Sequence, residues 1–153
     1  MTQRLSNRLR TTWPWLCAAA WLTAAAPALA SANVSCLIDD AFLKFELEAI
    51  AGRSGPIVQV QVGAIEIKPA AAKLKTPQIT FDRPQIIQQW MLGKELRLQV
   101  EVTDEAANEN VDLVILTQFN ERQSKYFGRY VLKISSTGKT KELKGRIKEC
   151  EAG

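Results

Sequence analysis

The sequence predicts an all-β fold, a single small antiparallel sandwich or barrel of about seven or eight strands built from residues 31–153. Three observations favour this class. Most of the segment alternates between apolar and polar residues with a period of two, as strands with one buried face do. Turn residues separate these alternating stretches at short intervals. A cysteine stands near each end of the segment, at Cys36 and Cys150, as in a small exported domain closed by a disulfide.

Residues 1–30 have the three-part pattern of a secretory signal peptide that is removed after export. Three arginines without any acid come first, an apolar stretch over residues 13–26 follows, and small residues surround Ala30. The apolar stretch is shorter than the roughly 20 residues that a membrane-spanning helix needs. We therefore expect a periplasmic or secreted protein that is cleaved before Ser31 or before Asn33 and whose mature form does not span the membrane.

Two cysteines remain after Cys17 leaves with the leader, and an even number of cysteines in an exported protein predicts a disulfide. A bond between Cys36 and Cys150 would close nearly the whole domain into one loop. Closing a loop of that size stabilises a fold by about 4–5 kcal/mol in the chain-entropy description. The alternative is a pair of buried thiols.

The alternating stretches predict strands at residues 41–49, 57–68, 78–81, 95–103, 111–119, 126–135 and 141–150. The stretch at 111–119 is apolar on both faces, which indicates a strand that is covered on both sides. In the stretch at 57–68 the alternation changes phase at Gly63-Ala64. Such a change at a glycine predicts a β-bulge, or else two short strands separated by a bend.

The segment at residues 83–92 fits two interpretations. We expect one short helix near 83–92, because Asp82 is a suitable cap, Pro84 suits a first turn and Gly93 suits the end. Its apolar residues share one helical face, namely Ile86, Ile87, Trp90 and Met91. The alternative is a strand that continues into a hairpin across Gly93-Lys94.

The charge of the chain argues against nucleic acid as a partner. The full chain has 20 basic and 16 acidic residues, but removal of the three leader arginines leaves 17 basic against 16 acidic ones, a net charge of +1. A nucleic-acid-binding domain needs a concentrated basic face. The basic character of the full chain comes instead from its leader.

No catalytic, metal or cofactor motif stands out. The chain has no histidine, which excludes Ser-His-Asp and Cys-His catalysis and histidine metal sites. It also has no phosphate-binding glycine loop. The adjacent acids Asp39 and Asp40 would point to opposite faces of a strand, or else occupy a solvated turn. We therefore expect no enzyme activity and no cofactor.

Two candidate binding surfaces remain. Lys144, Arg146 and Lys148 share one face of the last predicted strand and would form a basic stripe for an anionic partner. The same pattern also suits a wet face that protects an edge strand. On the preceding strand, Phe127 and Arg129 face away from the core-type residues Tyr126 and Tyr130, and aromatic residues mixed with arginine are typical of binding hot spots.

Taken together, these features predict an exported, non-enzymatic binding module that acts on a protein or an anionic component of the cell envelope. The alternatives are a barrel that carries a small apolar ligand, lined by residues such as Phe45, Val60, Leu98 and Ile115, and a structural subunit of an envelope assembly, which an exposed apolar patch would indicate.

Overall fold

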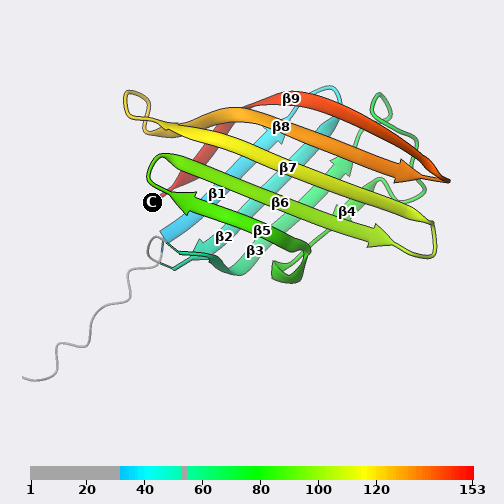
Figure 1. Cartoon of the computed structure of the whole chain (residues 1–153), viewed down its shortest axis with the longest axis horizontal. Helices are drawn as coiled ribbons and strands as arrows, with labels where there is room; N and C mark the ends of the chain where they lie inside the picture. Colours follow the sequence, from blue (N-terminus) through cyan, green and yellow to red (C-terminus); the bar gives the residue numbers. More distant parts are fainter. Residues whose placement is uncertain (1–31, 53–54) are drawn as a thin grey trace, which may run out of the picture.

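The computed structural model describes residues 32–52 and 55–153, which form one antiparallel sheet (Figure 1). The all-β, antiparallel prediction is confirmed, while the predicted leader at residues 1–30 lies outside the described residues. The nine strands and the one 3-10 helix of these residues are β1 (Ala32–Asp39), β2 (Leu43–Ala51), β3 (Ile57–Ile67), β4 (Gln78–Thr80), η1 (Arg83–Gln85), β5 (Ile86–Leu92), β6 (Glu95–Asp104), β7 (Glu109–Asn120), β8 (Lys125–Ser136) and β9 (Lys139–Ala152).

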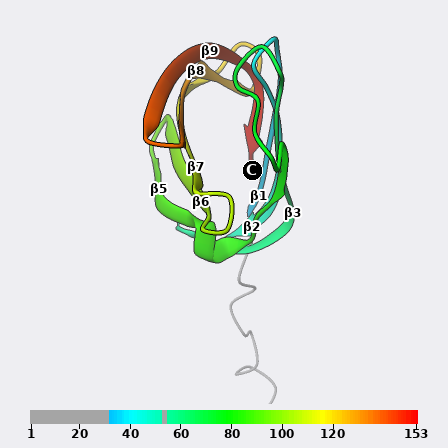
Figure 2. The same cartoon turned by 90° about the vertical axis from the view of Figure 1, so that its right-hand side faces the viewer.

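The strand order is β4-β3-β2-β1-β9-β8-β7-β6-β5. Two up-and-down halves, β1–β4 and β5–β9, therefore join through the pairing of the first strand with the last. Viewed along the longest axis of the molecule, the sheet curls around on itself (Figure 2). It is not closed, because β4 and β5 end the order at opposite edges and are not paired with each other in the described residues.

Side chains bridge the two edges of the curled sheet where backbone pairing is absent. Arg83 of η1 donates from Nε to the carbonyl oxygen of Ile57 on β3 at 2.6 Å, and from Nη1 to that of Ile86 on β5 at 2.9 Å. The amide of Ile57 donates to Gln89 Oε1 on β5 at 2.6 Å. Both backbone groups of Ile57 are thus satisfied across the gap, as a buried residue requires.

The core lies inside the curl, because alternate residues of each strand point inward. Phe45 on β2, Ile115 on β7 and Tyr130 on β8 are fully buried there. The prediction that Tyr126 and Tyr130 belong to the core is confirmed. The residues that alternate with the buried ones along each strand point outward and form the outer face of the sheet.

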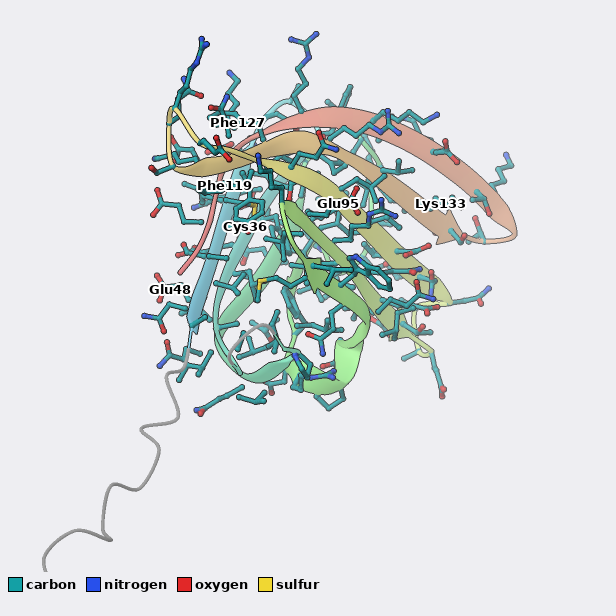
Figure 3. The ribbon with its side chains drawn as sticks, turned by 60° about the vertical axis from the view of Figure 1, so that its left-hand side comes forward. Cys36, Glu48, Glu95, Phe119, Phe127 and Lys133 are labelled. Carbon is teal, nitrogen blue, oxygen red and sulfur yellow. A yellow bond between two sulfur atoms is a disulfide. The ribbon has the colours of Figure 1, made fainter. Side chains whose placement is uncertain are left out.

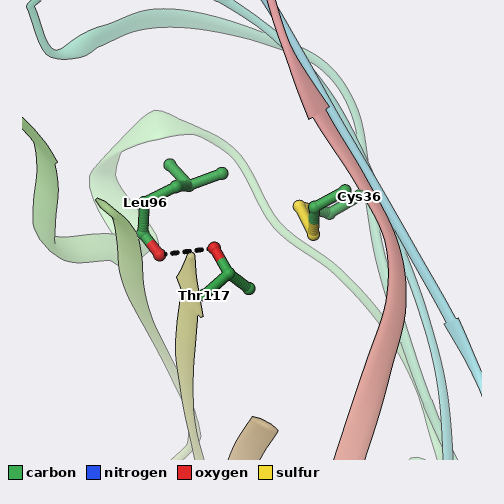
Figure 4. Close-up of a disulfide and its surroundings, with 4 residues drawn as sticks. Cys36, Leu96 and Thr117 are labelled. Carbon is green, nitrogen blue, oxygen red and sulfur yellow. Dashed lines mark hydrogen bonds between the residues drawn. A yellow bond between two sulfur atoms is a disulfide. The ribbon is translucent and has the colours of Figure 1, made fainter. Parts of the chain in front are cut away.

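The predicted disulfide between Cys36 and Cys150 is present, with an S–S distance of 2.03 Å (Figure 4). The two cysteines are direct partners on β1 and β9, and both are buried. Four residue pairs, from Val34–Leu37 on β1, join these strands in register, and Asn33 exchanges two backbone hydrogen bonds with Gly153 just beyond them. The bond therefore reinforces the short seam between the two halves of the sheet. Across the core from it, Thr117 Oγ1 donates to the carbonyl oxygen of Leu96 at 2.7 Å.

The prediction of a short helix near 83–92 is wrong beyond its first turn. Asp82 and Pro84 do start a 3-10 turn, but it ends at Gln85, and Ile86–Leu92 pairs with β6. The spacing of the apolar residues in this segment is compatible with a helix and with a strand. Pairing with a neighbouring strand therefore decides between the two. The hairpin across Gly93-Lys94 favours the strand, because Gly93 has a φ of 61°, which suits the first position of a two-residue turn.

The predicted β-bulge in β3 exists but lies nearer the start of the strand. From Ile67 back to Gly63, the pairing of β3 with β2 is continuous. Closer to the start of β3, the register shifts around Gln61 and again around Val58. As a result Val58, which the alternation would place on the buried face, has 61% of its surface exposed. Backbone pairing with the neighbouring strand, rather than the glycine itself, fixes where the extra residues lie.

Candidate functional site

Cross-strand pairing places five side chains in one row across the outer face of β5–β9. Trp90 on β5 pairs with Arg97 on β6, which pairs with Leu116 on β7. Leu116 pairs in turn with Arg129 on β8, and Arg129 lies opposite Arg146 on β9. Because neighbouring strands are about 4.8 Å apart, the row extends over about 19 Å. We refer to Trp90, Arg97, Leu116, Arg129 and Arg146 as the arginine row.

The three guanidinium groups of the arginine row are exposed and differ in their partners. Arg97 Nη2 lies 2.8 Å from Glu95 Oε2 on the same strand. Among the described residues, no carboxylate lies within ion-pair distance of Arg129 or Arg146. Like charges directly opposite each other in a sheet are destabilising. The facing pair Arg129 and Arg146 is therefore an unfavourable arrangement that an anion between the two groups would relieve.

Two shallow hollows lie along the arginine row. The first has a volume of about 600 Å³ and is lined by Glu95, Arg97, Leu116, Thr117, Gln118, Phe127, Gly128, Arg129 and Arg146. The second has a volume of about 580 Å³ and is lined by Ile87, Gln88, Gln89, Trp90, Arg97, Leu98, Gln99, Val114 and Leu116. They share Arg97 and Leu116, so together they follow the row from β9 to β5.

The structure brings three of the five predicted binding residues together. Phe127, Arg129 and Arg146 all line the first hollow, so the two surfaces that the sequence suggested are one. Lys144 lies on the same outer face of β9, but its Nζ is 3.1 Å from Glu142 Oε1. Lys148 is exposed and lies outside both hollows, near the register shift between β8 and β9. In Figure 3, Phe127 and Lys133 lie toward opposite ends of β8.

Trp90, Arg97 and Leu116 are the members of the row that sequence reasoning missed. The alternation of residues 95–103 correctly pointed Arg97 outward, but only the pairing of β6 with its neighbours places it near Arg129. Trp90 was assigned to a helical face, whereas on β5 it points outward with 53% of its surface exposed. An exposed tryptophan is unusual enough to signal a binding surface.

Acidic residues gather on a different part of the outer face. Glu46 and Glu48 point outward from β2, and Glu149 and Glu151 are exposed near the end of β9. Figure 3 shows Glu48 well separated from Lys133. The outer face therefore carries acidic side chains on β2 and near the end of β9, outside the arginine row.

The adjacent acids Asp39, at the end of β1, and Asp40, in the turn that follows, both have partners within the fold. Asp39 Oδ1 lies 2.5 Å from Lys68 Nζ. Asp40 accepts hydrogen bonds from Tyr130 Oη at 2.5 Å and from the backbone amides of Phe42 at 2.8 Å and Leu43 at 3.1 Å. The hydrogen bonds of Asp40 tie the first turn to the buried tyrosine of β8.

The Asp40–Tyr130 contact shifts the pKa values of both groups. Burial by itself raises the pKa of the Asp40 carboxyl, but the hydrogen bonds from Tyr130, Phe42 and Leu43, together with the charge of Lys68, outweigh it and lower the pKa. Burial raises the pKa of Tyr130, and the hydrogen bond to Asp40 and its negative charge raise it further.

The described part of the chain contains neither a metal-binding cluster nor a membrane-spanning helix. No three Asp, Glu or Cys side chains gather closely enough there to hold a metal ion. In residues 32–52 and 55–153, no helix has the length and apolar character needed to cross a membrane.

Comparisons with known proteins give no assignment. No family model matches the chain, and no curated protein or solved structure is significantly similar to it.

Proposed function

We propose that this protein is an exported, non-enzymatic binding module that docks an anionic partner through the arginine row. The observation that carries the proposal is the pair Arg129 and Arg146, which face each other on β8 and β9 without a carboxylate partner in the described residues. An anion bound between them would replace a repulsion with two charge-assisted interactions.

The chemistry of the row suits a partner with carboxylate, sulfate or phosphate groups. A guanidinium group forms paired, parallel hydrogen bonds to such groups, and these are among the strongest in proteins. Trp90 and Phe127 add aromatic surface beside the arginines, and tryptophan and arginine are the residues most often found at binding hot spots. The partner thus meets both charge and apolar surface on the same face.

The proposed compartment and the absence of catalysis have separate support. A buried disulfide is consistent with an oxidising, extracytoplasmic compartment. The first hollow holds no histidine, serine or cysteine among its lining residues, and its carboxylate, Glu95, is ion-paired with Arg97. These groups suit recognition of a charged partner better than proton transfer or nucleophilic attack.

A double substitution, Arg129→Gln with Arg146→Gln, tests the proposal. The matched control, Lys133→Gln with Lys139→Gln, removes the same charge from exposed positions outside both hollows. Binding to three immobilised polyanions would be measured, namely polygalacturonate, poly-L-glutamate and vesicles that contain phosphatidylglycerol. We expect the protein to bind at least one of them, and the arginine variant to lose about tenfold or more in affinity while the control loses far less.

Two outcomes would contradict the docking surface. One is that none of the three polyanions binds. The other is that both double variants lose affinity equally, which would indicate attraction by net charge rather than by the arginine row.

A pocket at the open edge of the sheet favours a second candidate, the carrier of a small apolar ligand. It has a volume of about 290 Å³, near the lower end for ligand sites, and lies between Ile57 on β3, Met91 on β5 and Leu96 on β6. Of the residues suggested from sequence, Leu98 lines this pocket, while Phe45, Val60 and Ile115 do not.

The apolar fluorescent probe N-phenyl-1-naphthylamine tests this second candidate. The carrier function predicts that the probe binds and that Met91→Trp, which fills the pocket, displaces it. Leu37→Trp adds the same side chain at an exposed position on β1 and should have no such effect. The carrier function is excluded if the probe does not bind, or if the two variants behave alike.

A further inference from the structure

The arginine row crosses the strands rather than following one of them. A ligand that engages Arg146, Arg129 and Arg97 together must extend perpendicular to the strands, over about 14 Å, and reaches Trp90 after one more strand spacing. The two hollows share Arg97 and Leu116, so the path is continuous. A linear chain with repeated anionic groups would fit this path, because it could place one group at each arginine.

The neutral groups beside the row narrow the chemistry of that chain. Gln88 and Gln99 pair with each other on the same outer face as Trp90 and Arg97, where Gln99 also donates from Nε2 to Asp112 Oδ1 at 2.8 Å. Gln118 pairs with both Glu95 and Phe127. Side-chain amides offer donors and acceptors that match hydroxyl groups. Trp90, with 53% of its surface exposed, offers a flat apolar face at one end of the row.

On these grounds we propose that the anionic partner is a linear acidic polysaccharide that lies along the arginine row, with its acid groups on Arg97, Arg129 and Arg146 and a sugar ring on Trp90. The inference rests on the proposed function and specifies its ligand. Arginines recognise the acid groups, the glutamines recognise hydroxyl groups, and the tryptophan packs against the C–H face of a ring.

Other polyanions fit these observations less well. An extended acidic peptide would gain little from its backbone here, because strand addition takes place along a sheet edge and not across the middle of five strands. Anionic membranes are typically bound by clusters of lysine and arginine next to a membrane segment or on an amphipathic helix. Neither partner explains the glutamines that flank the row.

The experiment compares ligands that differ in one property. Isothermal titration calorimetry on the exported protein would use polygalacturonate, the same polymer fully methyl-esterified and so uncharged, poly-L-glutamate, and phosphatidylglycerol vesicles. We expect polygalacturonate to bind and the esterified polymer to bind about tenfold or more weakly, because it lacks the carboxylates. Poly-L-glutamate and the vesicles should bind more weakly than polygalacturonate.

Substitutions at two positions then separate sugar recognition from charge. Trp90→Ala should weaken polygalacturonate several-fold and leave poly-L-glutamate unchanged, because only the sugar stacks on the ring. Gln88→Leu should act in the same direction through the lost hydrogen bonds, because Gln88 is exposed in the second hollow. Trp90 is the only tryptophan after residue 30, so a change in the tryptophan emission of the exported protein on binding would place the polymer near this residue. Thermal unfolding of each variant confirms that the fold is retained.

The outcomes distinguish this inference from the proposed function. If poly-L-glutamate or the vesicles bind in an Arg129- and Arg146-dependent way while polygalacturonate does not, the polysaccharide is excluded and the anionic docking surface stands. The same holds if Trp90→Ala weakens all polyanions equally. If no polyanion binds, both proposals are overturned.

Discussion

Tyr130 of β8 lies directly opposite Gly145 of β9, and its ring occupies the space that a side chain at position 145 would need. A Cβ atom on that glycine would be 2.3 Å from Tyr130 Cε1, far inside the distance at which carbon atoms attract each other. The glycine therefore allows a fully buried tyrosine to lie against the neighbouring strand and to reach Asp40 with its hydroxyl group.

Gly145→Ala should destabilise the protein. The new methyl group forces the Tyr130 ring or strand β9 to move, and overpacking of this kind costs about 1–3 kcal/mol. Urea denaturation would measure the free energy of unfolding. Gly52→Ala is the control, because no atom of another described residue lies within 4 Å of the added Cβ there. Equal stabilities for the two variants would show that the Tyr130 ring can move at no cost in stability, which would contradict this prediction.

Removal of the disulfide should be more costly. Cys36→Ala with Cys150→Ala releases the short seam between β1 and β9, and loss of a native disulfide in a small exported domain typically costs about 2–5 kcal/mol. Unfolding would be measured with and without a reducing agent. The reductant should bring the parent protein down to the level of the variant and leave the variant unchanged. A parent protein that is insensitive to reduction under unfolding conditions would contradict this.

The Asp40–Tyr130 contact predicts loss of stability at both extremes of pH. Asp40 has a pKa below its ordinary 3.8 in the fold, so its contribution is present above that value and is lost as the pH falls through the lowered pKa. Tyr130 has a pKa above its ordinary 10.0, so its contribution is present below that value and is lost as the pH rises beyond it. Urea unfolding between about pH 3 and pH 11 would show both limbs.

Tyr130→Phe isolates the contribution of the Asp40–Tyr130 contact to the stability of the protein. Deletion of the hydroxyl should cost about 1–3 kcal/mol near neutral pH, remove the Tyr130 part of the alkaline limb and make the acid limb shallower. Tyr126→Phe is the matched control, because its hydroxyl donates no hydrogen bond to another described residue, and it should remain close to the parent in stability. Identical behaviour of the two variants would argue against the contact.

Glu95→Gln should strengthen the binding of an anionic partner. Glu95 is the carboxylate in the first hollow and holds Arg97 at 2.8 Å, so its neutralisation frees a guanidinium group and removes a repulsion. We expect an increase in affinity of about two- to fivefold, the scale of an exposed ion pair. Glu105→Gln removes the same charge in the exposed turn after β6 and should have a much smaller effect. Equal gains would point to net charge alone.

Local pattern in the sequence was enough to predict which way most side chains point. Alternation placed Arg129, Arg146 and Phe127 on the outer face and Tyr130 in the core, and the structure agrees. The pairing of Cys36 with Cys150 followed from their number alone. These features depend on neighbours in the chain or on simple counting, and a period of two is a local property of the strand.

Only the tertiary structure decided that residues 86–92 form a strand and which residues make up the candidate site. Ile86, Ile87, Trp90 and Met91 suit a helix as well as a strand, and pairing with β6 made the choice. Arg97, Arg129 and Arg146 are neighbours because of the registers of three strand pairs, which hydrogen bonds between distant segments determine. A one-residue slip in any of those pairs would turn the paired strand over and break the row. Register is a long-range property, and the sequence of one strand does not carry it.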